Sequence, residues 1–142
     1  MSSNLSILTL LCFRQSSLFP QETAHWALQV LLWNPNAPSG SLFHVSKESL
    51  ASGQTSYRLV RNVNPMASSS LRALVEVASG VRLTDQMLDA HCISIAHDRS
   101  FDLVYNNSQR FCSQVLQRLV YNRVITQSQF DELALKGFQP LV

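Results

Sequence analysis

The first half of the chain places its hydrophobic residues in short runs that are typical of β-strands. The first run, LSILTLLCF, also has the apolar content of a signal-peptide core. No Lys or Arg precedes it and no small-residue cleavage site follows it, so a strand is the favoured interpretation. A turn-rich segment, NPNAPSG, separates the second and third runs and predicts that they form a hairpin. The predicted strands are residues 5–13, 24–33, 41–45 and 54–63.

The second half changes to the spacing of helices. Residues 68–78 place Leu71, Leu74, Val75 and Ala78 three or four apart, which predicts a helix that ends at Gly80. A short capped helix is expected after Thr84 at residues 85–88. Residues 92–96 (CISIA) and 101–105 (FDLVY) are predicted as short extended segments.

Two further helices are predicted near the end of the sequence. One opens at residues 106–108 and continues to about Arg123, with its apolar positions in one stripe. The other follows the capping-box pattern of residues 126–129 and ends at Gly137. The stripe consists of Phe111, Val115, Leu116, Leu119 and Val120.

Strands followed mainly by helices indicate an α+β fold, with a small antiparallel sheet packed against helices. The length of 142 residues predicts a single domain over residues 1–142. Hydrophobic residues make up 46% and charged residues 14%, which excludes a disordered tail. Three cysteines are too few for a disulfide scaffold, and thiols that stay unpaired indicate a reducing compartment, so a cytoplasmic location is expected.

Charge and hydropathy indicate which classes of binding partner are not expected. Eleven basic and nine acidic residues give a net charge of +2, and the basic residues are scattered rather than clustered. A nucleic-acid partner is therefore not expected. Membrane association is not expected either, because no apolar run approaches the roughly 20 residues of a spanning helix. The oligomeric state does not follow from the sequence.

Two histidines are candidates for acid–base chemistry. His25 and His44 each lie in a predicted strand, on either side of the hairpin turn. In antiparallel neighbours their imidazoles can share a sheet face, where one can orient the other as a base. The alternative is two ordinary, partly buried histidines that are bonded to backbone carbonyls.

A candidate nucleophile lies where the helix at residues 106–108 begins. A side chain in the first helical turn is close to free backbone amides and to the positive end of the helix dipole, and both stabilise negative charge. Ser108 holds such a position. The alternative is that Asn107 or Ser108 only caps the helix.

No metal or organic cofactor is expected. The chain has four scattered glycines and no phosphate-binding loop, and its cysteines form no C-x-x-C pair. His91, Cys92 and His97 do not have zinc-ligand spacing.

Taken together and in this order, three short motifs resemble the permuted papain-like superfamily, which includes the NlpC/P60-type hydrolases and the lecithin:retinol acyltransferase-like proteins. The motifs are HWAL at residues 25–28, LFHV at 42–45 and NSQRF at 107–111. The outline is also similar to fungal proteins of unknown role that have N-C-Q at the third motif. The resemblance covers roughly residues 24–120, and residues 46–99 match only in outline.

The resemblance implies a papain-like fold and a thiol-type hydrolase or acyltransferase that acts on an amide, ester or thioester. Residue 108 would attack the acyl carbonyl, His25 would take and return the proton, and His44 would orient His25. The backbone amides of Ser108 and Gln109 would bind the oxyanion. Trp26 and Asn107 are the candidate contacts to a small-molecule, acyl or peptide substrate, although packing in the core is the favoured interpretation of Trp26.

One position departs from the family pattern, because residue 108 is Ser where the family has its nucleophilic Cys. Three explanations are open: an engineered Cys-to-Ser change, a natural loss of thiol chemistry, or a serine nucleophile. Cys112, one turn further along the helix, is interpreted as a buried structural thiol rather than a displaced nucleophile.

Two other functions remain as alternatives to a thiol-type enzyme. The first is a non-catalytic binding or scaffold module on the same fold, which the missing thiol favours. The second is a membrane-associated lipid acyltransferase, which rests on the acyltransferase resemblance alone. Residues 134–142 contain no hydrophobic anchor of the kind that some such proteins have.

Overall fold

The computed structural model describes residues 6–13, 25–32, 40–47, 55–64, 71–98 and 107–140. They form an α+β fold in which one five-stranded antiparallel sheet has the strand order β4-β3-β2-β1-β5. The strands are β1 (Ser6–Phe13), β2 (His25–Leu32), β3 (Gly40–Lys47), β4 (Thr55–Val63) and β5 (Leu71–Val81). The helices are α1 (Asp85–Asp98), α2 (Asn107–Tyr121), α3 (Gln127–Asp131) and the 3-10 helix η2 (Glu132–Lys136).

The first four predicted strands are confirmed, and so is the hairpin. Strands β2 and β3 pair antiparallel, with Leu28 opposite Phe43 and Val30 opposite Ser41. Gly40 opens β3 at a point where the two backbones approach closely, because a Cβ at this position would collide with the carbonyl oxygen of Val30. Only glycine fits there without a shift of the backbone.

The predicted helix over residues 68–78 is wrong, because residues 71–81 form β5 along β1. The pairing of the two strands is irregular: Thr9 lies opposite Glu76, but Leu8 lies opposite Ala78. Such an irregularity places an extra residue in one strand and breaks the two-residue alternation of buried side chains. The pairing leaves Val75 and Ala78 buried three residues apart, as on a helix face, whereas Leu74, which also fitted the helical pattern, is 46% exposed.

The predicted extended segment at residues 92–96 is also wrong. It forms the second half of α1, where Leu88, Cys92 and Ile95 are buried at helical spacing. The predicted start of this helix is confirmed, since the Thr84 hydroxyl accepts a hydrogen bond from the Met87 amide at 3.1 Å. The predicted segment at 101–105 lies outside the described residues.

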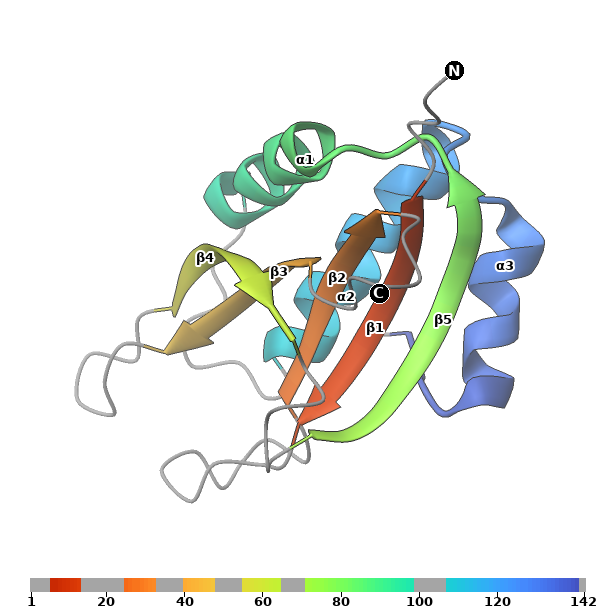
Figure 1. The fold of residues 1–142 in the computed structure, drawn as a ribbon, viewed down its shortest axis with the longest axis horizontal. Helices are drawn as coiled ribbons and strands as arrows, with labels where there is room; N and C mark the ends of the chain where they lie inside the picture. The colour runs from red at the N-terminus through yellow and green to blue at the C-terminus, as the bar shows by residue number, and fades with distance from the viewer. Residues whose placement is uncertain are drawn as a thin grey trace.

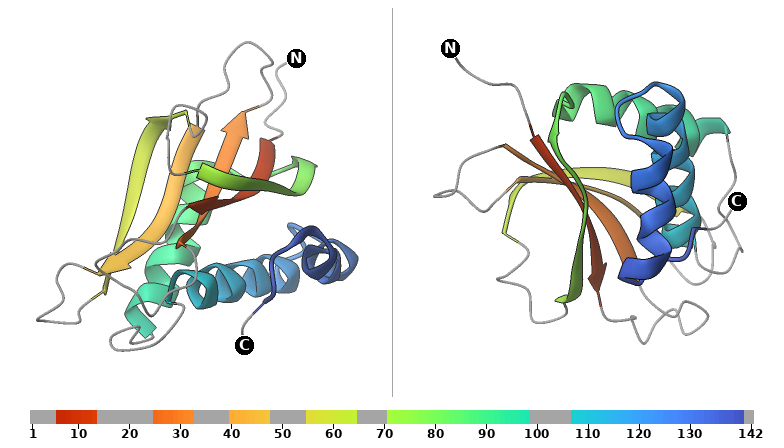
Figure 2. Two further views of the ribbon diagram at one scale, coloured as in Figure 1. Left: turned by 90° about the horizontal axis from the view of Figure 1, so that it is seen from below. Right: turned by 90° about the vertical axis from the view of Figure 1, so that its right-hand side faces the viewer.

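The helices cover one face of the sheet. Helix α2 packs along β2 and β3, α1 lies beside α2 near β3 and β4, and α3 lies next to β5 (Figure 1 and Figure 2). The apolar stripe of α2 meets Leu10, Leu28 and Phe43 from the sheet in one hydrophobic core. Among the described residues, no helix is long and apolar enough to cross a membrane.

Candidate functional site

The first turn of α2 contacts the start of β2. Ser108, the second residue of α2, is 1% exposed. Its Oγ accepts a hydrogen bond from the backbone N–H of Trp26 at a distance of 3.0 Å. The two residues are 82 positions apart in the sequence, so the fold joins the first and third motifs of the sequence analysis.

The position of Ser108 favours negative charge on its side-chain oxygen. The first turn of α2 contains no acidic residue. The first amides of a helix have no acceptor within the helix, and the helix dipole is positive at this end. The Trp26 N–H adds a donor from another element. For a thiol at residue 108 these donors would favour the ionised form, whereas the burial of this position opposes it.

Cys112, one turn further along α2, is in a different environment. It is fully buried in the core, and this burial, followed by the nearby Cys92, raises the pKa of its thiol well above the ordinary value. A thiol that resists ionisation is a poor nucleophile. This agrees with its interpretation as a structural residue.

Trp26 belongs to the core. Its ring is 7% exposed and meets the Phe138 ring edge-on, with the ring centroids 4.8 Å apart. In this structure Trp26 therefore packs in the core. The side chain of Asn107, the other predicted substrate contact, lies outside the described residues.

His44 is half-buried in β3, directly opposite Arg58 of β4. Its neighbour Phe43 faces the helices, so His44 projects from the other face of the sheet. Burial lowers the pKa of His44, and the charge of Arg58 lowers it further. The ring is therefore mainly neutral at pH 7, and it lies on the sheet face opposite to α2, which carries residue 108.

His25 opens β2, where it pairs with Phe13 of β1. Its side chain lies outside the described residues, and so do its predicted contacts with residue 108 and with His44. The backbone of His25 adjoins Trp26, whose amide contacts Ser108. The roles predicted for His25 and His44 stay predictions.

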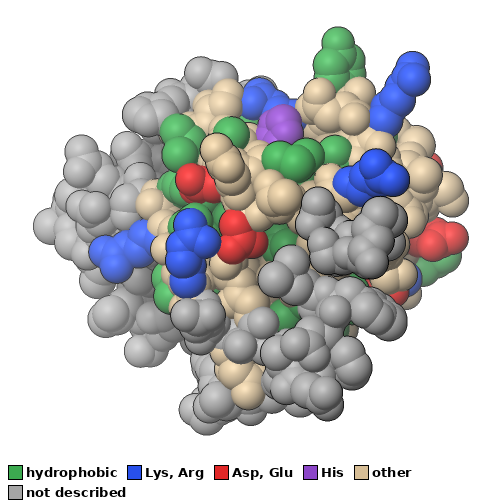
Figure 3. All heavy atoms as spheres, turned by 45° about the horizontal axis from the view of Figure 1, so that its top comes forward, with side chains coloured by type: hydrophobic (Ala, Val, Ile, Leu, Met, Phe, Trp, Pro, Cys, Tyr) green, Lys and Arg blue, Asp and Glu red, His purple; other side chains and the backbone are tan. Residues whose placement is uncertain are grey.

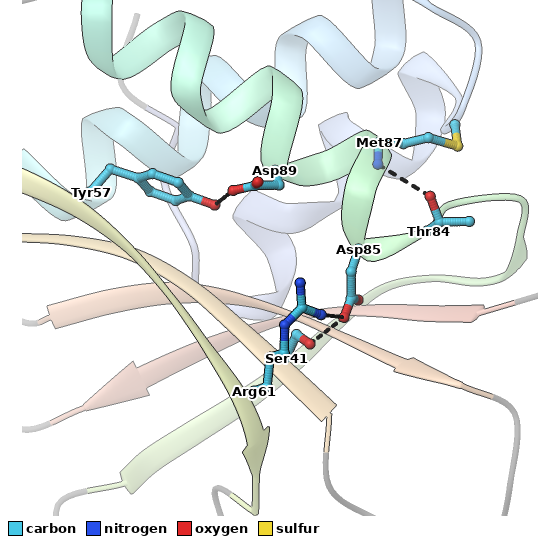
Figure 4. Close-up of polar contacts among 7 residues, drawn as sticks. All are labelled: Ser41, Tyr57, Arg61, Thr84, Asp85, Met87 and Asp89. Carbon is cyan, nitrogen blue, oxygen red and sulfur yellow. Dashed lines mark hydrogen bonds and ion pairs between the residues drawn. The ribbon is translucent and has the colours of Figure 1, made fainter.

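A group of polar contacts that was not expected from the sequence attaches α1 to the sheet. The Asp85 carboxylate accepts hydrogen bonds from the hydroxyl of Ser41 and from Nη1 of Arg61, the latter at 3.1 Å. One turn later, Asp89 accepts a hydrogen bond from the Tyr57 hydroxyl at 2.6 Å (Figure 4). The spacing of Asp85 and Asp89 on one helix face is the sequence signal for this contact.

Metal binding is the other chemistry that titratable side chains could support. In the part of the chain that the structure describes, no three His, Cys, Asp or Glu side chains form a possible metal site. His91 and Cys92 lie on α1, and burial shifts the pKa of each toward its neutral form. On the face that carries α1, basic, acidic and apolar side chains are interspersed (Figure 3).

Comparisons with protein-family models, with curated proteins and with solved structures found no match to this chain.

Proposed function

We propose that the contact between β2 and α2 is an acyl-transfer site of the thiol-hydrolase type on a papain-like fold, with residue 108 in the position of the nucleophile. The observation that carries this proposal is the hydrogen bond from the Trp26 amide to the Ser108 hydroxyl oxygen. It supports the proposal because it joins the strand that begins with His25 to the first turn of the helix that carries residue 108.

The proposed reaction needs a nucleophile, a base and an oxyanion site. With cysteine at residue 108, the sulfur attacks the acyl carbonyl while His25 accepts the thiol proton. The amides of residues 108 and 109 stabilise the oxyanion. The leaving group then takes the proton from His25, and attack by water or an acceptor on the acyl-enzyme releases the product.

Serine changes the expected activity of this site. A hydroxyl has to lose its proton during attack, whereas a thiolate forms near neutral pH beside a histidine. The Ser108 side chain is also 1% exposed. We therefore expect the chain with serine at residue 108 to be weak or inactive as an acyl-transfer enzyme.

The test is the reactivity of a Ser108→Cys variant toward a limiting amount of a thiol electrophile. Intact mass and peptide mapping separate residue 108 from Cys12, Cys92 and Cys112, which are all buried. Fast labelling at residue 108 near neutral pH is expected, and His25→Ala in the same background should abolish it. His91→Ala, which changes a histidine on α1, is the matched control and should leave the rate unchanged.

A second candidate is a non-catalytic binding or scaffold module on the same fold. The burial of Ser108 and its hydrogen bond to Trp26 favour it, because both are typical of a structural residue that joins a helix to a sheet. Labelling of Ser108→Cys no faster than that of a free thiol, with and without His25→Ala, would reject the acyl-transfer site. The binding module would then be the better proposal.

A further inference from the structure

Strand β5 forms one edge of the sheet, and no described strand pairs with its outer side. Figure 2 shows this edge from the side, with α3 lying on the helix face of the sheet. An outer strand presents backbone N–H and C=O groups that can pair with a strand of another chain. The pairing of β5 with β1 is regular over residues 73–76 and irregular on both sides, so this short stretch is where another strand could be added.

The direction of the backbone groups of β5 follows from contacts within the sheet. The carbonyl oxygen of Gln29 in β2 faces β1, because it accepts a hydrogen bond from the Thr9 hydroxyl at 3.4 Å. Thr9 lies opposite Gln29, so the backbone groups of Thr9 face β2 and those of Leu10 face β5. Leu10 lies opposite Val75. The backbone groups of Val75 therefore face β1, and those of its two neighbours face the outer edge.

Lys136 of η2 already binds one of these outward groups. Its Nζ donates a hydrogen bond to the backbone carbonyl of Glu76 at 3.0 Å. An added strand would need the same carbonyl as an acceptor, so the lysine and the strand would compete for it. Lysine is one of the residues by which proteins protect outer strands from pairing. This hydrogen bond is exposed, and exposed hydrogen bonds open at low cost.

The sequence of β5 is self-complementary around Leu74, which is 46% exposed. If two β5 strands pair antiparallel with Leu74 on the two-fold axis, residue 72 of each copy lies opposite residue 76 of the other. Arg72 then meets Glu76 at both ends of the pair, and both residues are exposed. Opposite charges in such positions stabilise a strand pair. A two-fold axis at residue 76 would instead place two glutamates opposite each other, and one at residue 75 would place Glu76 opposite Leu74.

The other outer strand, β4, does not have this complementarity. Its charged residues are Arg58 and Arg61, and it contains no acidic residue. Two copies of β4 would bring only like charges together, which opposes pairing. The charge pattern therefore favours β5 over β4 as the edge that pairs with its own copy.

We propose that the outer edge of β5 is a surface for association with a second copy of this chain, and that Lys136 keeps it closed in the monomer. When the lysine of each copy is displaced, the Glu76 carbonyl can accept from the amide of residue 72 of the second copy. The two sheets then continue as one antiparallel sheet. The irregular pairing on either side limits the contact to a few residues, so the association is weak. This surface goes beyond the proposed acyl-transfer site and does not depend on it.

The test is the dimerisation of Lys136→Met, measured by sedimentation equilibrium from micromolar to millimolar concentration. Methionine keeps an apolar chain of similar length but cannot donate to the Glu76 carbonyl. Each dimer needs the release of two such hydrogen bonds, so we expect the variant to lower the dimer dissociation constant about tenfold. Lys47→Met is the matched control. It makes the same change of charge at the end of β3, an inner strand, and should leave the constant unchanged.

Charge reversals in the Lys136→Met background test the register. Glu76→Arg brings basic residues together at both ends of the pair and should weaken the dimer, and its combination with Arg72→Glu should restore it. Leu74→Cys should cross-link to its counterpart under a mild oxidant, since residues in a hydrogen-bonded pair lie about 5.5 Å apart. Val60→Cys, at an outer-strand residue that is 41% exposed, is the control in β4 and should not cross-link.

Each outcome decides the proposal. It is overturned if Lys136→Met stays monomeric at millimolar concentration or dimerises no more than Lys47→Met. It is also overturned by a dimer that does not respond to the charge reversals or that cross-links through Val60→Cys, because the interface would then lie elsewhere. A dimer that follows the charge reversals and cross-links through Leu74→Cys supports pairing through β5.

Discussion

The hydroxyl of Tyr57 in β4 donates a hydrogen bond to Oδ1 of Asp89 in α1 at 2.6 Å. The ring of Tyr57 also lies 5.9 Å from that of Phe111, so this one residue joins the sheet to both α1 and α2. The position of α1 therefore depends on a polar contact as well as on its buried apolar residues.

Tyr57→Phe tests this contact. The variant keeps the ring and removes only the hydroxyl, so we expect a loss of about 1.5–3 kcal/mol in the free energy of unfolding, as for a hydrogen bond to a carboxylate. Urea denaturation measures this loss. Tyr121→Phe, at a residue that is 87% exposed, is the control and should change stability by less than about 0.5 kcal/mol. Equal effects of the two substitutions would contradict the role of Tyr57.

Tyr57 also leads us to predict that the stability of the protein changes with pH in the alkaline range. Burial raises the pKa of Tyr57, and the nearby Cys92 and the bond to Asp89 raise it further. The folded protein therefore keeps this proton at a pH where the unfolded chain releases it, so stability should fall as the pH rises above about 10. Tyr57→Phe should reduce the slope of unfolding free energy against pH in this range. An unchanged slope would contradict the prediction.

Ser108→Ala tests the bond between α2 and β2. The variant leaves the buried amide of Trp26 without its acceptor, which costs about 1–3 kcal/mol of unfolding free energy. Ser113→Ala is the matched control, because Ser113 is also a buried serine of α2 but its hydroxyl donates to the carbonyl of Gln109 within the same helix. Thermal or urea denaturation should show a clearly larger loss for Ser108→Ala.

Gly40→Ala tests the close approach of β2 and β3. The added methyl group would collide with the carbonyl oxygen of Val30, so the backbone has to shift and the hairpin should lose about 1–3 kcal/mol. Gly80→Ala is the comparison: the added carbon meets no atom within 4 Å, although the φ of 65° adds strain of about 1 kcal/mol. A smaller loss at Gly40 than at Gly80 would contradict the close approach.

From the environment of His44 we predict that the stability of the protein changes with pH in the mildly acidic range. Burial and then Arg58 lower the pKa of His44 below its ordinary value of 6.5. The unfolded chain therefore binds this proton first as the pH falls, and stability should decrease below about pH 6.5. His44→Gln should flatten the unfolding free energy between pH 7 and 5. The shift at His91 has the same sign, so the double variant with His91→Gln should be flatter still.

Local sequence patterns correctly predicted the elements whose conformation depends mainly on residues that are close together in the chain. The alternation of residues 54–63 predicted β4, and the apolar stripe beginning at Phe111 predicted α2. The Thr126 capping box is present with both of its hydrogen bonds, at 3.0 and 2.9 Å. Gly137 ends η2 in the left-handed conformation that glycine favours at such a position. These features depend on neighbours in the chain, so the sequence is sufficient to predict them.

The conformations of β5 and of residues 92–96 depended on tertiary contacts. Leu71, Leu74, Val75 and Ala78 are spaced like one face of a helix, but pairing with β1, a distant segment of the sequence, makes this segment the strand β5. Residues 92–96 became helical because α1 packs an apolar face on the core, and a five-residue apolar run has no periodicity that could show this. In both segments the packing partner, rather than the local pattern, determined the conformation.

The sequence was enough to predict the α+β class, four of the five strands and the start of α2, where Ser108 lies. The burial of Ser108 and its bond to the Trp26 amide became visible only in the folded chain. The same holds for the contacts of Phe138 with Trp26 and of Gln139 with Gln109. The physical reason is the range of the interactions. Caps, turns and periodic burial act within a few residues, whereas these contacts join the start of β2, the start of α2 and residues 138–139, which lie far apart along the chain.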